Sequence, residues 1–208
     1  MFKPDSFLFK MLSTMFNLIM YNVLFIICCI PLVTAGASWA ALYQMISNVI
    51  EDSSSSLEVF FSTFAGKLKK TLLPWSVVLV MTALILTDYL FITNTAGSAA
   101  AIPGGTYIQV LLVFVFVVVI ALSSYLFPLI AMNDQPVKQL LAYSFYLAVS
   151  NLPLTILMVI LNAAPFAVLF FFPQIAAFYL PVWGLIVFSL VTYADAMIIK
   201  HCLAKYNQ

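Results

Sequence analysis

Two acidic residues lie inside apolar stretches of the sequence and are its clearest candidates for chemistry. Asp88 is predicted near the outer end of one membrane helix, and Asp195 near the inner end of another. Ionisable groups within membrane spans are costly, and by default they suggest proton relays or substrate sites. Each acid also lies within about one or two turns of a predicted membrane boundary, where the cost falls. A structural role therefore stays open, with Asp195 contacting Lys200 or headgroup water. Their placement at opposite faces disfavours a catalytic pair.

Side-chain amides form a second candidate set. They lie on the first two predicted helices and on the fifth: Asn17, Asn22, Gln44, Asn48 and Asn162. Amides in lipid need partners, so we expect them to form hydrogen bonds between helices. The alternative is a sugar-binding cluster, which would combine amides with aromatic faces such as Tyr43 and Trp39. For Trp39, anchoring at the outer membrane interface is the simpler interpretation.

The sequence contains no recognisable catalytic motif. It has no G-x-S-x-G, no H-E-x-x-H and no glycine-rich phosphate loop. His201 is its only histidine, and Cys28, Cys29 and Cys202 show no C-x-x-C spacing. We therefore expect no enzymatic activity, no cofactor and no metal site.

Composition indicates that membrane helices position these residues. Hydrophobic residues make up 65% of the 208 residues and charged residues only 7%, against about a quarter charged in soluble domains. Three stretches carry no charge: Lys10 to Glu51, Asp88 to Asp134, and Lys138 to Asp195. Each is longer than the roughly 20 residues that cross a bilayer as a helix. We predict an all-α, polytopic membrane protein that forms one domain over residues 1–208.

Six crossings are predicted, together with two amphipathic cytoplasmic helices. The crossings are Ser13–Leu32, Ala35–Ile50, Thr71–Ile92, Tyr107–Met132, Leu152–Phe171 and Ile175–Ile199. The amphipathic helices cover residues 57–70 and 136–151, the second with Asp134 as its N-cap. Residues 57–93 and 136–172 also resemble each other weakly, as an internal repeat would.

The lysines predict the orientation of the chain. Lys200 and Lys205 place the C-terminus in the cytoplasm by the positive-inside rule. Counting back one crossing at a time, all eight lysines then face the cytoplasm of a bacterial plasma membrane, and so do both termini. Lys67, Lys69 and Lys70 fit topology determinants better than a nucleic-acid site.

The sidedness of the N-terminus depends on a corner between the first two predicted helices. Pro31 resists helix continuation and Thr34 can cap the next helix. Gly36 and Ala41 belong to a run of small residues that lets helices approach closely. Because residues 35–50 are short for a full span, a kinked or re-entrant segment, giving five spans, is the alternative. Cleavage as a signal peptide is disfavoured because Met11–Val33 exceeds the usual apolar length.

The corner also carries a resemblance. It shows the pattern N…P-L-V-T-A-G-A…A-A-L-Y, formed by Asn22, Pro31, Thr34, Gly36, Ala41, Leu42 and Tyr43. This pattern resembles the YesL-like family of small bacterial integral membrane proteins of unknown function. The resemblance implies a link to carbohydrate utilisation, and no catalytic residue is known for the family.

Two functions follow as expectations. The first is a non-enzymatic accessory or regulatory partner of carbohydrate uptake. It would contact the lipid bilayer and either a sugar ABC-transporter permease or a second copy of itself. The second is a small solute or proton transporter acting through the helix bundle, with Asp88, Asp195 and the amides along the path. Polar residues converging on one cavity favour transport, whereas scattered pairs at helix contacts favour the accessory role.

Overall fold

A computed structural model describes residues 7–51, 53, 56–95, 105–172, 174 and 176–206, and contains no strand in those ranges. The helices are α1 (Phe7–Cys29), α2 (Ala35–Ile50), α3 (Leu57–Thr95), α4 (Gly105–Met132), α5 (Val137–Ser150), α6 (Leu152–Phe171), α7 (Ala176–Val182) and α8 (Phe188–Tyr206). A 3-10 turn, Leu32–Thr34, precedes α2, and a π-helical segment, Trp183–Val187, joins α7 to α8. The all-α prediction is confirmed.

Five helical segments are long and apolar enough to cross a membrane, within the described part of the chain. They are Leu12–Cys29, Leu57–Asp88, Gln109–Met132, Leu152–Leu169 and Tyr179–Ala204. The chain is therefore a multi-pass membrane protein by the length and composition of its helices. The 16-residue helix α2 is not among these segments. The sixth crossing and the cytoplasmic position of the amphipathic segments stay predictions.

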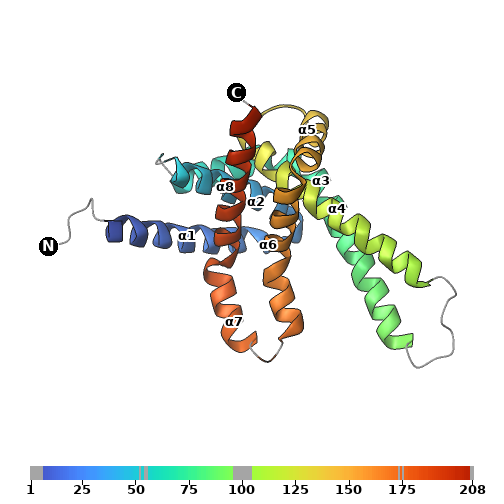
Figure 1. Cartoon of the computed structure of the whole chain (residues 1–208). Helices are drawn as coiled ribbons and strands as arrows, with labels where there is room; N and C mark the ends of the chain where they lie inside the picture. Colours follow the sequence, from blue (N-terminus) through green and yellow to red (C-terminus); the bar gives the residue numbers. More distant parts are fainter. Residues whose placement is uncertain are drawn as a thin grey trace.

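The helices do not form a bundle of parallel rods. Figure 1 shows α6 beside α8, and the second part of α3 beside α4, as two hairpins that diverge from a common end. Helix α1 runs across α8 rather than alongside it (Figure 1). Helices α1 and α2 pack against each other and form the helical hairpin that the corner predicts.

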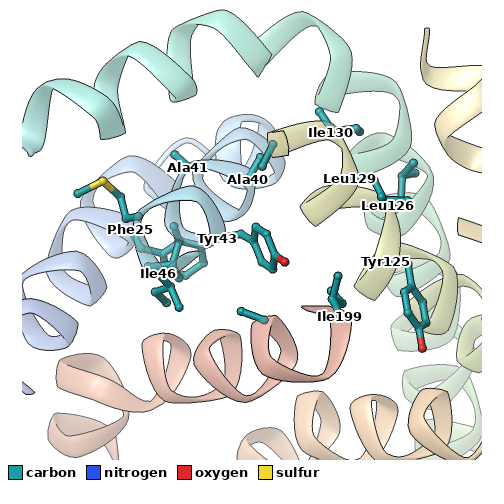
Figure 2. Packing of buried hydrophobic residues seen from close by; sticks show 14 of the residues in the cluster. Phe25, Ala40, Ala41, Tyr43, Ile46, Tyr125, Leu126, Leu129, Ile130 and Ile199 are labelled. Carbon is teal, nitrogen blue, oxygen red and sulfur yellow. The ribbon is translucent and has the colours of Figure 1, made fainter. Parts of the chain in front are cut away.

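Helix α2 lies at the centre of the protein. It packs against α1, α3, α4 and α8, and most of its residues are buried. Ala40, Ala41, Tyr43 and Ile46 are all fully buried, and Figure 2 shows them among side chains of α1, α4 and α8. Small side chains bring backbones close together, where van der Waals contact holds helices in lipid. This explains how so short a helix contacts so many others.

Three predicted helix boundaries are corrected. The amphipathic stretch 57–70 and the crossing 71–92 form one continuous helix, α3, which includes Pro74. Proline removes one backbone hydrogen bond and bends a helix without necessarily ending it. Figure 1 shows α3 turning between its teal first part and its green second part. The last predicted crossing, 175–199, is interrupted by the π-helical segment.

The third correction concerns Asp134, which does not cap α5. Pro136 occupies the N-cap position and no side chain caps the helix. The Asp134 carboxylate instead lies 2.7 Å from the Nζ of Lys67 and 3.5 Å from that of Lys70. Asp134 precedes this N-cap position by two residues, and its carboxylate is paired with the two ammonium groups. The contact ties the α4–α5 connection to α3.

The internal repeat stays a prediction, as does the single domain. The two repeat units differ in one respect, because α3 is continuous whereas Asn151 separates α5 from α6. Helix α6 begins and ends at the predicted residues, Leu152 and Phe171.

Candidate functional site: polar contacts between helices

Asn22 joins α1 to the last helix of the chain. Its Nδ2 donates to the Gly184 carbonyl at 2.7 Å, and its Oδ1 accepts from the Ser189 N–H at 2.9 Å. Asn22 is fully buried. The bonds between helices that we predicted for the amides are therefore present at Asn22.

The π-helical segment explains why an amide is needed at this point. Where a helix passes from α to π spacing, some backbone groups lose their usual partners. Gly184 lies within the segment and Ser189 just after it. An asparagine side chain supplies one acceptor and two donors, so Asn22 satisfies a carbonyl and an N–H together. Without Asn22, the buried Ser189 N–H would be unpaired and the partly buried Gly184 carbonyl would lose this donor.

Thr34 fixes the corner between α1 and α2, although not as predicted. It occupies the N-cap position of α2 but makes no side-chain cap bond. Its Oγ1 lies 2.7 Å from the Cys28 carbonyl and 2.8 Å from the Pro31 carbonyl and donates backward across the turn. Pro31 cannot donate a backbone hydrogen bond. Thr34 thus satisfies carbonyls at the end of α1 rather than N–H groups at the start of α2.

Gly36 permits a close approach of α2 to α3. A Cβ atom at this position would lie 2.7 Å from the Cβ of Trp75 and 3.2 Å from Phe127. Neither neighbour is a flexible chain end that moves aside easily. The Trp75 ring also donates from Nε1 to the Leu32 carbonyl at 2.6 Å. Trp75 therefore packs on Gly36 and binds the corner at the same time.

Asp195 and Asn162 form a polar pair between α8 and α6. The Asn162 Nδ2 donates to the Asp195 Oδ2 at 2.8 Å and lies 2.9 Å from the Met158 carbonyl. Asp195 is only 3% exposed. The predicted contact of Asp195 with Lys200 is wrong, because the Lys200 Nζ lies 2.8 Å from Glu51 Oε1. Lys200 follows Asp195 by five residues, whereas residues three or four apart are neighbours on a helix surface. Asp195 is buried in the protein instead of reaching the boundary.

The other predicted residues do not join this pair. Asp88 is half-buried on α3, and Asn17 is half-buried on α1. The Gln44 amide donates to Asn48 Oδ1 at 3.0 Å within α2, so the predicted bond to another helix is wrong for Gln44. Tyr43 is fully buried. Trp39 packs edge-on against the Phe25 ring, 5.8 Å between centroids, and faces the interior instead of anchoring an interface.

A cavity of about 410 Å³ lies between α2, α3, α4 and α6. Its walls are mainly aromatic and aliphatic, and its polar groups are Thr82, Ser123, Ser124 and Asn162. Trp39 and Trp75, both partly buried, line it. Neither Asp88 nor Asp195 lines it. An apolar cavity of this size suits an apolar group better than a hydrated solute.

Three contacts were not predicted from the sequence. They are the Lys67–Asp134 ion pair, the Trp75 bond to Leu32 and a buried bond of 3.0 Å between the hydroxyls of Tyr125 and Thr155. The lysine cluster indicated only topology, although Asp134 falls on the same predicted side of the membrane, which was a usable hint. Nothing in the spacing of Tyr125 and Thr155 indicates that they meet.

Comparison with known proteins finds a family match for part of the chain. No curated protein and no solved structure matches it. Residues 18–89 match the family model described as "Protein of unknown function, DUF624". The match contains the corner pattern from Asn22 to Tyr43 together with most of α3. Over this segment the resemblance predicted from the corner is confirmed: the chain matches an uncharacterised family with which YesL-like membership is consistent.

Proposed function

We propose that this protein is a non-enzymatic accessory protein of the bacterial plasma membrane, which assembles with or regulates a membrane partner. The partner class is a permease of carbohydrate uptake, and this part of the proposal rests on the family resemblance alone. The function itself rests on how the polar side chains are distributed.

One observation carries the proposal: the polar residues are paired at separate helix contacts. Asn22 binds the π-helical segment, Gln44 binds Asn48 within α2, and Asn162 binds Asp195. Asp88 lies elsewhere on α3. A path for a solute or proton needs such groups along one connected cavity. Their use as contacts between and within helices is the arrangement expected of a structural role.

The proposal includes the predicted orientation, with six crossings and the lysine-bearing end in the cytoplasm. Two ion-paired clusters support it, Lys67 and Lys70 with Asp134, and Lys200 with Glu51. Figure 1 shows the first part of α3, α5 and the end of α8 at one end of the molecule. A shared charged end agrees with the positive-inside rule.

A small transporter is the second candidate, and one observation favours it. The cavity reaches Asn162, whose amide binds the buried Asp195. In this version, the carboxylate would accept a proton supplied through the cavity. The apolar lining of the cavity argues against it.

Affinity capture from the native membrane tests the accessory role. The tagged full-length chain is extracted in a mild detergent, and an unrelated tagged multi-pass protein from the same membrane is the control. We expect a carbohydrate permease in near-stoichiometric amount with this chain and none with the control. Recovery of this chain alone, or only as a homo-oligomer, would contradict the permease assignment.

A further inference from the structure

The buried carboxylate of Asp195 has no cationic partner. Its Oδ2 accepts from Asn162 at 2.8 Å, and its Oδ1 is buried without a hydrogen-bond partner among the described residues. The residue is 3% exposed, within the apolar segment Tyr179–Ala204. A buried carboxylate is strongly unfavourable unless a positive charge or several donors compensate it. One amide donor is less than such a group needs.

The nearby lysines are engaged elsewhere. Lys200, five residues along α8, pairs with Glu51 and donates to the Ser47 carbonyl at 3.3 Å. Lys67 and Lys70 pair with Asp134 in the α4–α5 connection. Within the described part of the chain, no lysine side chain forms an ion pair with Asp195. The protein itself therefore leaves this negative charge uncompensated.

Other unpartnered oxygen atoms lie near this carboxylate. The hydroxyls of Thr192 and Ser189, three and six residues before Asp195 on α8, are buried and make no hydrogen bond in the described structure. Residues three apart share one face of a helix. The Tyr43 hydroxyl is likewise buried and unpartnered. Helix α2 packs against α8, and Figure 2 shows the Tyr43 ring extending from α2 toward α8.

We propose that Asp195, Thr192 and Tyr43 form an internal site for a small monovalent metal cation such as Na⁺. The Asp195 Oδ1 supplies the negative charge, and the two hydroxyl oxygens supply neutral ligands. The site lies between α2 and α8, so an occupying ion holds the central helix against the last one. This inference is independent of the permease assignment, because it concerns binding and not a partner.

The ligand chemistry selects the kind of ion. Carboxylate and hydroxyl oxygens are hard ligands that suit hard cations rather than soft metals. Histidine and thiolate ligands are absent from the set. A single carboxylate balances one positive charge and leaves a second charge uncompensated in an apolar setting.

Thermal unfolding tests the site. The purified full-length chain is kept in a neutral detergent and a sodium-free buffer with choline chloride, which is replaced stepwise by NaCl at constant ionic strength. A ligand that binds only the folded state raises the unfolding temperature with its concentration. We expect a saturable rise for the wild type and none for Asp195→Asn. Thr192→Val, which keeps the shape and removes the hydroxyl, should move the NaCl midpoint upward several-fold.

Asp88→Asn is the matched control, because it removes an acid from an apolar helix outside the site and should keep the full response. If Asp195→Asn fails to fold, Thr192→Val and Tyr43→Phe still test the site through the NaCl midpoint. A wild-type unfolding temperature that is equal in choline and in sodium would overturn the proposal. So would a full sodium response in Asp195→Asn.

Discussion

The Asn22 side chain binds the Gly184 carbonyl on a helix 162 residues further along the chain, at 2.7 Å. This bond and the Ser189 N–H bond connect the corner-forming hairpin to the only π-helical segment in the described part of the chain. A residue of the family-matched segment thus stabilises an irregular helix that lies outside that segment. The connection explains why an amide stands in the middle of a highly apolar helix.

Replacing the buried Asn22 should destabilise the protein strongly. Asn22→Leu keeps the branched shape of the side chain but removes the partners of the buried Ser189 N–H and of the partly buried Gly184 carbonyl. An unpaired buried group costs about 1–3 kcal/mol, so we expect a loss of about 2 kcal/mol or more in the free energy of unfolding. Chemical unfolding in detergent micelles measures it. Asn17→Leu, on the same helix, should change the free energy far less, and equal losses for the two variants would contradict the role of Asn22.

Two glycines should respond in opposite directions to the same substitution. Gly36→Ala places a Cβ 2.7 Å from the Trp75 Cβ and forces α2 and α3 apart, which should cost about 1–3 kcal/mol. At Gly66 an added Cβ meets nothing within 4 Å, and Gly66→Ala should stabilise α3 by about 0.5–1 kcal/mol. Unfolding of the two variants under identical conditions gives both values. A neutral Gly36→Ala would show that the helices do not approach this closely.

Acid should weaken the contact between α3 and the α4–α5 connection. Lys67 and then Lys70 lower the pKa of Asp134 from its ordinary value of 3.8. The stabilisation is present above pH 3.8 and is lost as the pH falls through the lower folded-state pKa. Because the carboxylate is exposed, salt should weaken the effect as well. Stability measured from about pH 5 to pH 2 should decline less steeply for Asp134→Asn than for the wild type. Parallel declines would exclude Asp134 as the group responsible.

Thiol labelling tests the orientation, and the structure determines which positions to use. The native Cys202 is fully buried, so its protection from a reagent reports burial rather than sidedness. The predicted topology places Ala100 on the outer side, between the crossings Thr71–Ile92 and Tyr107–Met132, but this residue lies outside the described residues. His201 and Gln174 are both exposed. In a cysteine-free background, we expect a membrane-impermeant reagent to label Gln174→Cys in intact cells, and His201→Cys only after permeabilisation. The opposite pattern would invert the topology.

The sequence predicts the features that depend on local chemistry. The charge-free stretches indicate membrane helices, and α6 has the predicted boundaries because Asn151 and Pro153 mark its start and Pro173 follows its end. The proline–threonine–glycine corner likewise turns where predicted. These features need only the residues beside them.

Features that depend on distant parts of the chain were missed. The predicted boundary between residues 70 and 71 is absent, because packing of α3 against α2 and α4 keeps the helix continuous there and through Pro74. Lys200 was the nearest cation to Asp195 in sequence. In space, however, Lys200 pairs with Glu51, which directly follows α2. Nothing in the residues of the last helix predicts a π-helical segment. The Gly184 carbonyl of that segment accepts its hydrogen bond from the Asn22 amide of α1. Such contacts become visible only when helices are placed against one another.

The central claim is that the polar residues hold helices together and do not form a transport path. Flux into liposomes containing only the purified chain tests it most directly, with a pH-sensitive dye inside for protons and radiolabelled sugars for solutes. We predict rates equal to those of protein-free liposomes for the wild type, Asp88→Asn and Asp195→Asn. A wild-type flux that either substitution abolishes would contradict the account and establish the chain as a transporter.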